Sequence, residues 1–246
     1  MIIDGMKLDG GVQSFLLIGQ SNMAGRGEMG DVAPIHNPAC HVLRMGRWQL
    51  MTEPINHDRS IFSGQPRSGI CLAASFADDA QKATGQKIGV IPCADGGTSI
   101  DQWMPGGILY DHALMMTKLA MRTSHLAGIL WHQGESDCMS VDSARAHKQK
   151  FIKMITSLRR DLGNENIPVI IGQLCEDISE KYALPECLRM INEQYREVVS
   201  EIPACAFVSC EGLTLKADIL HFDSVALREF GRRYFEVYSE LCGIAK

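Results

Sequence analysis

Ser14-Phe-Leu-Leu-Ile-Gly-Gln-Ser-Asn-Met-Ala-Gly25 is the stretch that decides the fold, an apolar run that ends abruptly in small and polar residues. Phe15 to Ile18 are apolar without alternation, which is typical of a strand buried on both faces of a parallel sheet, and Gly19 marks the turn that follows. Ligands of open parallel sheets bind beyond the carboxyl ends of the strands. Ser21 would lie at such an end, so it is a candidate nucleophile; the alternative is an ordinary Ser/Asn cap of a helix.

The composition is that of an ordinary globular protein. The chain has 246 residues, 46% of them hydrophobic and 22% charged, which one α/β domain over residues 1–246 accommodates without a linker. The net charge of -5 and the pI near 5.9 provide no basic surface, so neither nucleic acid nor an anionic membrane is expected as a partner. A small or sugar-like substrate is compatible with this charge, and the oligomeric state stays open.

The nine cysteines are an odd number. Five of them stand in or beside apolar segments that we interpret as strands or buried helix faces, namely Cys71, Cys93, Cys175, Cys205 and Cys210. They are expected to be reduced thiols of the core. The first residues show no basic segment followed by a long apolar one, and no stretch approaches the length that spans a bilayer. A cytoplasmic enzyme is therefore the default expectation.

Apolar strands alternate with amphipathic helices along the chain, which predicts a parallel sheet of five core strands covered by helices on both faces. After the first strand, the core strand segments are 87–93, 126–131, 168–174 and 205–210; 40–45 is a further strand candidate, with 46–51 as a short segment that pairs with it. Helices are expected over 69–84, 110–124, 141–162, 184–202 and 224–241. Gly163 would stop the third of these, and Asp223 or Ser224 would cap the last. Thr52 to Ser68 is a long polar connection of the kind that often forms a substrate wall.

Polar residues follow several strands at positions that meet at one edge of such a sheet. They are Ser21 after the first strand, Gly96-Gly97 after 87–93, Gln133 after 126–131, and Asp218 with His221 after the last strand. Acyl transfer needs a hydroxyl beside a base, a carboxylate that orients the base, and N–H donors for the oxyanion. Asp218 stands three residues before His221, so its carboxylate can meet Nδ1 within one turn and leave Nε2 for Ser21. The set predicts serine-dependent acyl transfer.

Four blocks of sequence together resemble the SGNH-type esterases over nearly the whole chain. They are Gly19-Gln-Ser-Asn-Met23, Gly96-Gly-Thr-Ser99, His132-Gln-Gly-Glu135 and Asp218-x-x-His221. Within these esterases the chain looks most like the acetylxylan esterase and sialate O-acetylesterase-related branch, carbohydrate esterase family 6. The resemblance implies a three-layer α/β/α sandwich with a five-stranded parallel, flavodoxin-like sheet. It also implies a serine mechanism that removes acetyl groups from the hydroxyls of a small-molecule or oligosaccharide acetyl ester, without a metal or another cofactor.

The resemblance assigns roles to single residues. Ser21 is the nucleophile, His221 the general base and Asp218 its orienting partner. The Ser21 N–H, an N–H of Gly96 or Gly97 and the side-chain amide of Gln133 would form the oxyanion hole. Many members of the wider superfamily carry Asn at the position of Gln133 and Asp at that of Gln20. A glutamine keeps the amide donor and places it one methylene further out.

Five further residues near the blocks are candidates for substrate binding: Gln20, Asn22, Arg26, Trp103 and Glu135. Trp103 is suited to stack on a sugar ring or, equally, to close its loop against the core. Glu135 is better suited to brace the rim by bonding backbone N–H groups or Arg26. Arg26 and Arg59 either contact substrate or pair with acids.

Other patterns offer competing interpretations. Gly25-Arg-Gly-Glu-Met-Gly30 matches the dinucleotide fingerprint, but it starts several residues too late, and two prolines stop the helix that should receive the pyrophosphate. His132, Glu135 and Asp137 are possible metal ligands, although three such residues are a weak signal. His112, His125 and His147 are expected on solvated helix surfaces. Two functions compete with an esterase: a catalytically silent carbohydrate-binding protein and, less favoured, a dinucleotide-dependent enzyme using Gly25, Gly27 and Gly30.

Overall fold

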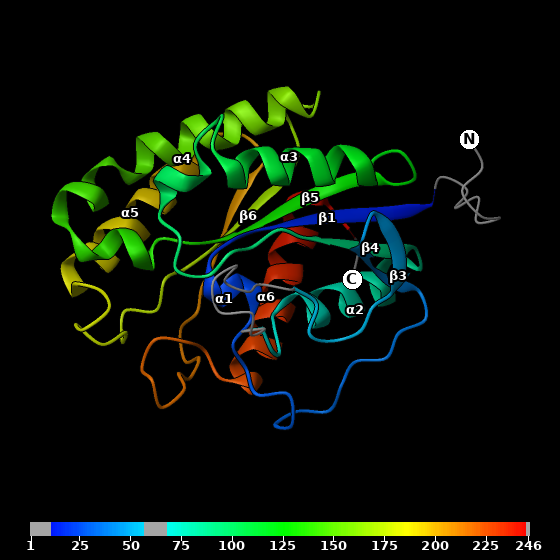
Figure 1. Cartoon of the computed structure of the whole chain (residues 1–246), viewed down its shortest axis with the longest axis horizontal. Coiled ribbons are helices and arrows are strands. Elements are labelled where there is room, and N and C mark those ends of the chain that lie inside the picture. The colour runs from blue at the N-terminus through cyan, green and yellow to red at the C-terminus, as the bar shows by residue number, and fades with distance from the viewer. Residues whose placement is uncertain (1–10, 57–67, 245–246) are drawn as a thin grey trace.

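The computed structural model describes residues 11–56 and 68–244, and these residues build one mixed sheet between two layers of helices (Figure 1). The described sheet has seven strands in the order β3-β2-β4-β1-β5-β6-β7. Their bounds are β1 Val12–Gly19, β2 Cys40–Arg44, β3 Arg47–Leu50, β4 Lys87–Pro92, β5 His125–His132, β6 Val169–Gly172 and β7 Cys205–Val208. Six of them run parallel, and β3 pairs with β2 in the antiparallel direction.

The predicted flavodoxin-like core is present, with two strands added to it. Taken in chain order, β1, β4, β5, β6 and β7 form the spatial order 2-1-3-4-5, which is the flavodoxin arrangement. The expectation of five strands is nevertheless too low, because β2 and β3 extend the sheet beyond β4 as a hairpin. Met45 (φ 50°) and Gly46 (φ 75°) form its two-residue turn, and two positive φ angles are the geometry that such tight hairpins require.

Helices cover both faces of the sheet, as predicted. On one face lie α2 (Ala73–Thr84) and α6 (Ser224–Cys242); on the other lie α3 (Ile108–Ala120), α4 (Val141–Asp161) and α5 (Pro185–Glu201). Phe15 of β1 illustrates the packing, since its ring meets Phe76 of α2 at 4.8 Å and Tyr238 of α6 at 5.1 Å, both edge to face. The Asp223 side chain accepts the Ala226 N–H and so caps α6, which selects between the two predicted caps.

The cysteines behave as predicted. All five that were placed in the core are buried and carry free thiols. Among the described helices, none combines the length and the apolar character that crossing a membrane requires.

The carboxyl ends of the parallel strands form the edge at which the candidate site residues gather. Gly19, the last residue of β1, has a φ of 133° and pairs with His132 of β5. A Cβ at residue 19 would lie 2.1 Å from the His132 carbonyl oxygen, so only glycine allows this close approach. The Gln20 N–H still donates to that carbonyl at 2.9 Å, and the short helix α1 (Ser21–Ala24) begins at the next residue. Ser21 is thereby held at the sheet edge.

Candidate active site

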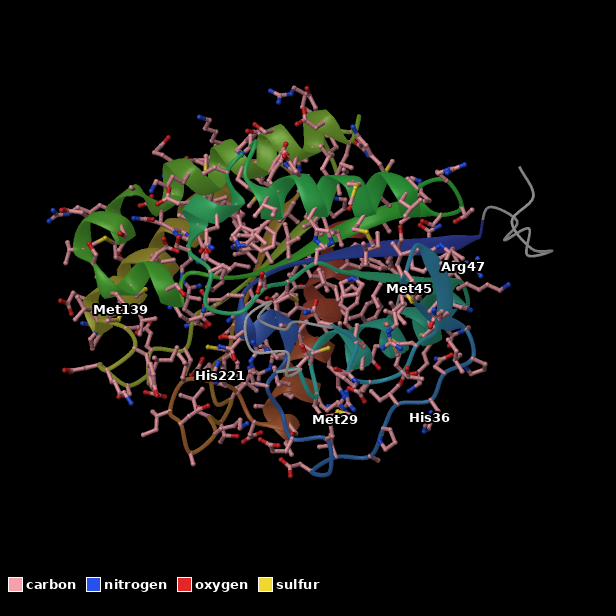
Figure 2. The ribbon with its side chains drawn as sticks, in the orientation of Figure 1. Met29, His36, Met45, Arg47, Met139 and His221 are labelled. Carbon is pink, nitrogen blue, oxygen red and sulfur yellow. The ribbon has the colours of Figure 1, made fainter. Side chains whose placement is uncertain are left out.

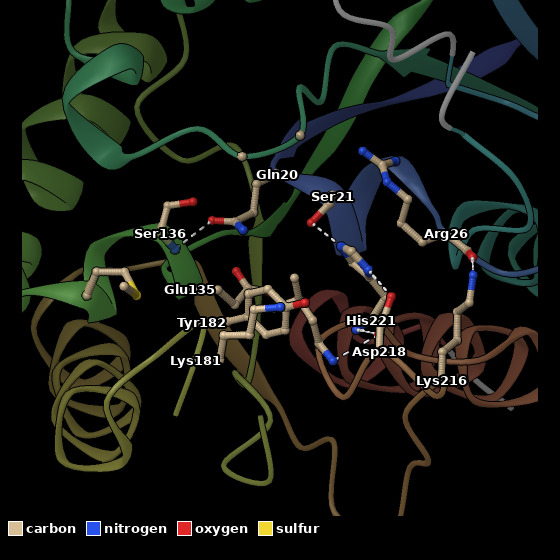
Figure 3. Close-up of a pocket in the computed structure, with 14 residues that line it drawn as sticks. Gln20, Ser21, Arg26, Glu135, Ser136, Lys181, Tyr182, Lys216, Asp218 and His221 are labelled. Atoms are coloured by element: carbon tan, nitrogen blue, oxygen red, sulfur yellow. Dashed lines mark hydrogen bonds and ion pairs between the residues drawn. The ribbon is translucent and has the colours of Figure 1, made fainter. Parts of the chain in front are cut away.

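A cavity of about 680 Å³ opens at this edge, within the size range of small-molecule sites. Residues that follow β1, β4, β5, β6 and β7 all contribute to its wall. In Figure 2, His221 marks its position, and the β2–β3 hairpin with Met45 and Arg47 lies at a distance from it. Figure 3 shows the side chains that surround Ser21 and His221.

Ser21, His221 and Asp218 form a hydrogen-bonded chain. Ser21 Oγ lies 3.0 Å from His221 Nε2, and His221 Nδ1 lies 2.8 Å from Asp218 Oδ2. With Nδ1–H donating to the carboxylate, Nε2 is the atom that faces the hydroxyl and accepts its proton. Ser21 is 5% exposed and lines the cavity, so its oxygen is accessible from one side only. This is the geometry of a nucleophile, a general base and an orienting carboxylate.

The turn between Asp218 and His221 is locally strained and well bonded. Asp218 Oδ1 accepts the backbone N–H groups of Leu220 and His221, each at 3.0 Å. Ile219 between them has a φ of 51°, a conformation that costs a β-branched residue roughly 1–3 kcal/mol. Burial alone would raise the pKa of Asp218, but hydrogen bonds from the backbone and ring of His221 and from the Leu220 N–H hold it below its ordinary value. The carboxylate therefore stays ionised beside the imidazole.

Asn22 and Glu135 brace this turn from behind. Asn22 Nδ2 donates to Glu135 Oε1 at 2.7 Å, and Asn22 Oδ1 accepts the Phe222 N–H at 3.1 Å. Glu135 Oε1 also lies 3.3 Å from His132 Nε2. Burial raises the pKa of Glu135, but the neighbouring His132 and the Asn22 amide more than offset this and leave the pKa below its ordinary value. Asn22 is 1% exposed, so the structure gives it a bracing position in place of the substrate contact expected from the sequence.

The partners of Glu135 agree with the expected bracing in part. Its carboxylate bonds Asn22, approaches His132 and accepts its own backbone N–H, whereas the sequence suggested backbone N–H groups or Arg26. Arg26 lines the cavity, with its NH1 bonded to the Gly25 carbonyl at 3.0 Å. The candidate Arg59 and most of the predicted substrate wall at 52–68 lie outside the described residues.

Gln133 does not face the cavity, contrary to its expected place in the oxyanion hole. It is fully buried, and its Nε2 donates to Asp137 Oδ2 at 2.6 Å and to the Thr98 carbonyl at 2.9 Å, with Gln20 Oε1 as a third, more distant acceptor at 3.3 Å. Both amide protons are therefore used inside the protein. Gly96 and Gly97 line the cavity as expected, and so does Gln20.

Trp103 lies in the core and closes its loop, which is the second of its two predicted roles. It is 1% exposed, its Nε1 donates to Thr98 Oγ1 at 3.1 Å, and its ring meets Trp131 edge to face at 5.8 Å. No face of the indole is left for a sugar.

The structure also bears on the metal and dinucleotide interpretations, which the sequence disfavoured. Asp137 accepts the Gln133 amide at 2.6 Å and the Ile100 N–H at 2.9 Å, and no three potential ligands converge anywhere in residues 11–56 and 68–244. No helix follows the glycines at 25, 27 and 30 before β2, so nothing there could receive a pyrophosphate. Gly27 instead forms a β-bridge with Ile70.

The predicted solvated histidines differ from one another. His112 is exposed on α3 as expected, but His125 begins β5 and is exposed on a strand. His147 is fully buried on α4, where its Nε2 lies 2.8 Å from Tyr195 Oη, so its predicted surface position is wrong. The reason is that α4 packs against α5, which turns the His147 side of the helix inward.

Sequence reasoning missed part of the cavity wall. Lys181 and Tyr182 follow β6, Ser136 and Met139 follow β5, and Lys216 and Leu220 flank the Asp218 turn. Their position was available in principle, because loops at the carboxyl ends of parallel strands form such sites. No local pattern distinguishes these residues from other surface residues.

Comparison with known proteins places this geometry in context. A family model described as carbohydrate esterase, sialic acid-specific acetylesterase matches residues 11–240. A probable carbohydrate esterase of Arabidopsis thaliana, At4g34215, is 30% identical over an alignment of 252 residues that covers 94% of this chain and 92% of that protein. The X-ray structure of the Arabidopsis thaliana protein AT4G34215 superposes with a TM-score of 0.82 at 27% identity, over 95% of this chain and 99% of that one.

A carbohydrate acetylesterase from Xanthomonas citri shares the fold at 17% identity. Its TM-score is 0.69, and the match covers 93% of this chain and 56% of that one. The finer placement in carbohydrate esterase family 6 stays a prediction.

Proposed function

The chain belongs to the carbohydrate esterases of the sialic acid-specific acetylesterase family and is a carboxylic ester hydrolase, and from this premise we propose that it is a serine O-acetylesterase. Its substrate is an O-acetylated sugar acid of the sialic acid type. The observation that carries the mechanism is the chain of contacts from Ser21 Oγ to His221 Nε2 at 3.0 Å and from His221 Nδ1 to Asp218 at 2.8 Å, at the wall of the cavity.

The reaction follows from this geometry. His221 Nε2 takes the proton from Ser21 as Oγ attacks the acetyl carbonyl, and Asp218 stabilises the imidazolium that forms. The tetrahedral intermediate collapses when His221 gives its proton to the departing sugar oxygen. Water then attacks the acetyl-serine with His221 again as the base, and acetate leaves. The proton transfers use the Ser21–His221 and His221–Asp218 contacts of the structure.

The charge of the cavity wall supports an acidic sugar over a neutral xylo-oligosaccharide. Arg26, Lys181 and Lys216 line it, whereas its two carboxylates are engaged with Asn22 and with His221. Lys216 pairs with Glu28 at 2.6 Å. Lys181 is exposed, and its Nζ lies over the Tyr182 ring at 5.1 Å from the centroid, so its charge is available to a ligand carboxylate. Figure 3 shows these cations on both sides of the catalytic pair.

The mechanism is tested by labelling with an organophosphonate. Wild-type protein should acquire one phosphonyl group at Ser21, located by peptide mass spectrometry, and should lose its activity on a small acetyl ester in step. Ser21→Ala should acquire none. Labelling at another residue, or full activity of labelled protein, would contradict the serine mechanism.

The substrate class is tested by comparing an O-acetylated sialic acid with its methyl ester, which lacks the negative charge. Lys181→Gln should raise KM for the acid about two- to fivefold, the range of an exposed ion pair, and leave KM for the methyl ester unchanged. Lys118→Gln on α3 is the matched control and should change neither value. Equal values of kcat/KM for both esters and for an acetylated xylo-oligosaccharide would contradict an acidic substrate.

A further inference from the structure

The side chain of Gln20 stands beside the nucleophile with its orientation fixed. Gln20 directly precedes Ser21, is 3% exposed and lines the same cavity. Its backbone is extended and is bonded to β5 through the Gln20 N–H and the His132 carbonyl at 2.9 Å. The side chain therefore starts from a rigid point of the sheet edge.

Three N–H donors hold the carbonyl oxygen of this amide. Gln20 Oε1 accepts the backbone N–H of Ser136 at 3.2 Å, that of Gly134 at 3.4 Å, and Nε2 of Gln133 at 3.3 Å. The Gln20 amide must turn its oxygen toward these donors, because a flipped amide would place its own NH₂ group against three N–H groups. The turn after β5 therefore determines which way the Gln20 amide points.

The nitrogen of the amide consequently points away from this turn. Within the described residues Gln20 Nε2 makes no hydrogen bond, although the oxygen makes three. An amide nitrogen without a partner is either fully buried or exposed, and Gln20 Nε2 is not among the fully buried atoms that lack a partner. It is therefore exposed to the cavity, which Gln20 lines. Figure 3 shows the Gln20 oxygen directed to Ser136 and the nitrogen on the cavity side, near the Ser21–His221 pair.

We propose that the Gln20 side-chain amide is a catalytic hydrogen-bond donor to the oxyanion of the tetrahedral intermediate, together with the Ser21 N–H and the Gly96-Gly97 turn. This inference rests on the proposed serine esterase function. When Ser21 Oγ adds to the acetyl carbonyl, the carbonyl π electrons move to oxygen, and the resulting alkoxide needs preorganised donors. A donor whose partner atom is already locked by three hydrogen bonds requires little reorganisation.

The same contacts explain why Gln133 cannot take this role. Its two amide protons are shared by three acceptors inside the protein: Asp137 Oδ2 at 2.6 Å, the Thr98 carbonyl at 2.9 Å and Gln20 Oε1 at 3.3 Å. Gln133 acts instead as one of the groups that position Gln20. The predicted donor type, a side-chain amide, is thus retained, but the residue that supplies it changes.

Two variants separate donation from mere bracing. Gln20→Glu keeps an oxygen that accepts the Gly134 and Ser136 N–H groups but removes the donor. Gln20→Met removes donor and acceptor without adding charge. For a catalytic donor, kcat should fall about 10²- to 10³-fold in both variants, with KM changed less than about threefold. Only Gln20→Met should also lose thermal stability.

Two results with the Gln20 variants would overturn the inference. Wild-type kcat in Gln20→Glu would show that the acceptor alone matters, and wild-type kcat in Gln20→Met would show that added charge alone inhibits; either result overturns the inference. Should Gln20→Met not fold, the affinity of Gln20→Glu for an aryl boronic acid decides, because this inhibitor forms a tetrahedral adduct with serine. The affinity should fall by about the same factor as kcat/KM, and an unchanged affinity would contradict donation.

Failure of the inference and failure of the proposed function are distinguishable. A wild-type protein that neither hydrolyses an acetyl ester nor reacts at Ser21 with an organophosphonate contradicts both. A wild-type protein that does both, with Gln20 variants of undiminished kcat, contradicts only the role of Gln20.

Discussion

Replacing Asn22 by Ala should loosen the catalytic histidine without removing any catalytic group. The change deletes the 2.7 Å hydrogen bond to the Glu135 carboxylate and the 3.1 Å hydrogen bond from the Phe222 N–H. A hydrogen bond to a charged group contributes about 1.5–3 kcal/mol, and a buried N–H left without a partner costs about 1–3 kcal/mol. We therefore expect the free energy of unfolding to fall by about 3–4 kcal/mol, which lowers Tm by about 10 °C in a chain of this length.

The kinetic effect should accompany the loss of stability. Phe222 follows His221 directly, so a displaced backbone at residue 222 moves the base relative to Ser21. Misplacement on the order of 1 Å costs roughly 10²-fold in rate, and we expect kcat to fall by about 10- to 100-fold with KM nearly unchanged. Unfolding in urea and steady-state hydrolysis of a small acetyl ester measure the two effects.

Asn192→Ala is the matched control for this prediction. Asn192 is also a buried asparagine on α5, with bonds to the Leu174 N–H and carbonyl at 2.9 Å each and none to the turn from Asp218 to His221. It should lower Tm to a similar extent and spare kcat. The reasoning is refuted if Asn22→Ala keeps wild-type kcat, or if it raises KM alone, which would make Asn22 a substrate-binding residue.

The remaining predictions concern the catalytic groups directly. Ser21→Ala should lower kcat on the order of 10⁴-fold with an unchanged circular dichroism spectrum, and a loss below tenfold would eliminate the serine mechanism. Asp218 has a pKa below its ordinary value of 3.8, so the stability it provides is present above that pH and is lost as the pH falls through the lowered value. The Tm of Asp218→Asn should accordingly fall less than that of wild type on acidification below about pH 4. Gln133→Glu places a second carboxylate beside that of Asp137 and should lower Tm more than Gln20→Glu does. A Gln133→Glu variant with the Tm of wild type would contradict the 2.6 Å contact between residues 133 and 137. EDTA should leave activity unchanged, and inactivation reversed by zinc would contradict the proposed mechanism.

The fold was accessible from the sequence because its main elements carry strong local patterns. The unbroken apolar run of β1 and the amphipathic helices predict a covered parallel sheet. The flavodoxin-like order of its strands was expected only from the resemblance of the four sequence blocks to the SGNH-type esterases. The β2–β3 hairpin was recognised in pieces, although the strand count did not include it. Its turn, Met45-Gly46, lacks the usual Asn-Gly or Asp-Gly signature of a tight hairpin.

The proposed catalytic residues could be singled out for a different reason. Ser21 stands at a strand end, and Asp218 and His221 are so close in sequence that a single turn brings them together. Asn22 was not recognisable as a brace, since its partners Glu135 and Phe222 are 113 and 200 residues away along the chain. Contacts of this kind depend on how loops meet at the sheet edge, and no spacing in a single sequence encodes them.

The direction of the Gln133 side chain could not be predicted from the sequence. It follows β5 and was therefore placed at the sheet edge, but side chains alternate between the faces of a strand, and this alternation continues into the first residue beyond it. Trp131 points to the α4–α5 face, where its Nε1 meets Tyr195 Oη at 2.8 Å, and Gln133 two residues later points the same way. Its own carbonyl accepts the Tyr195 hydroxyl at 2.6 Å, which holds the backbone in that orientation. Gly134, with a φ of 143°, then reverses the chain so that backbone N–H groups, and not the Gln133 amide, face the cavity wall. A side-chain donor at the oxyanion has to come from the neighbouring strand, and Gln20 at the end of β1 is the residue that those N–H groups hold in place.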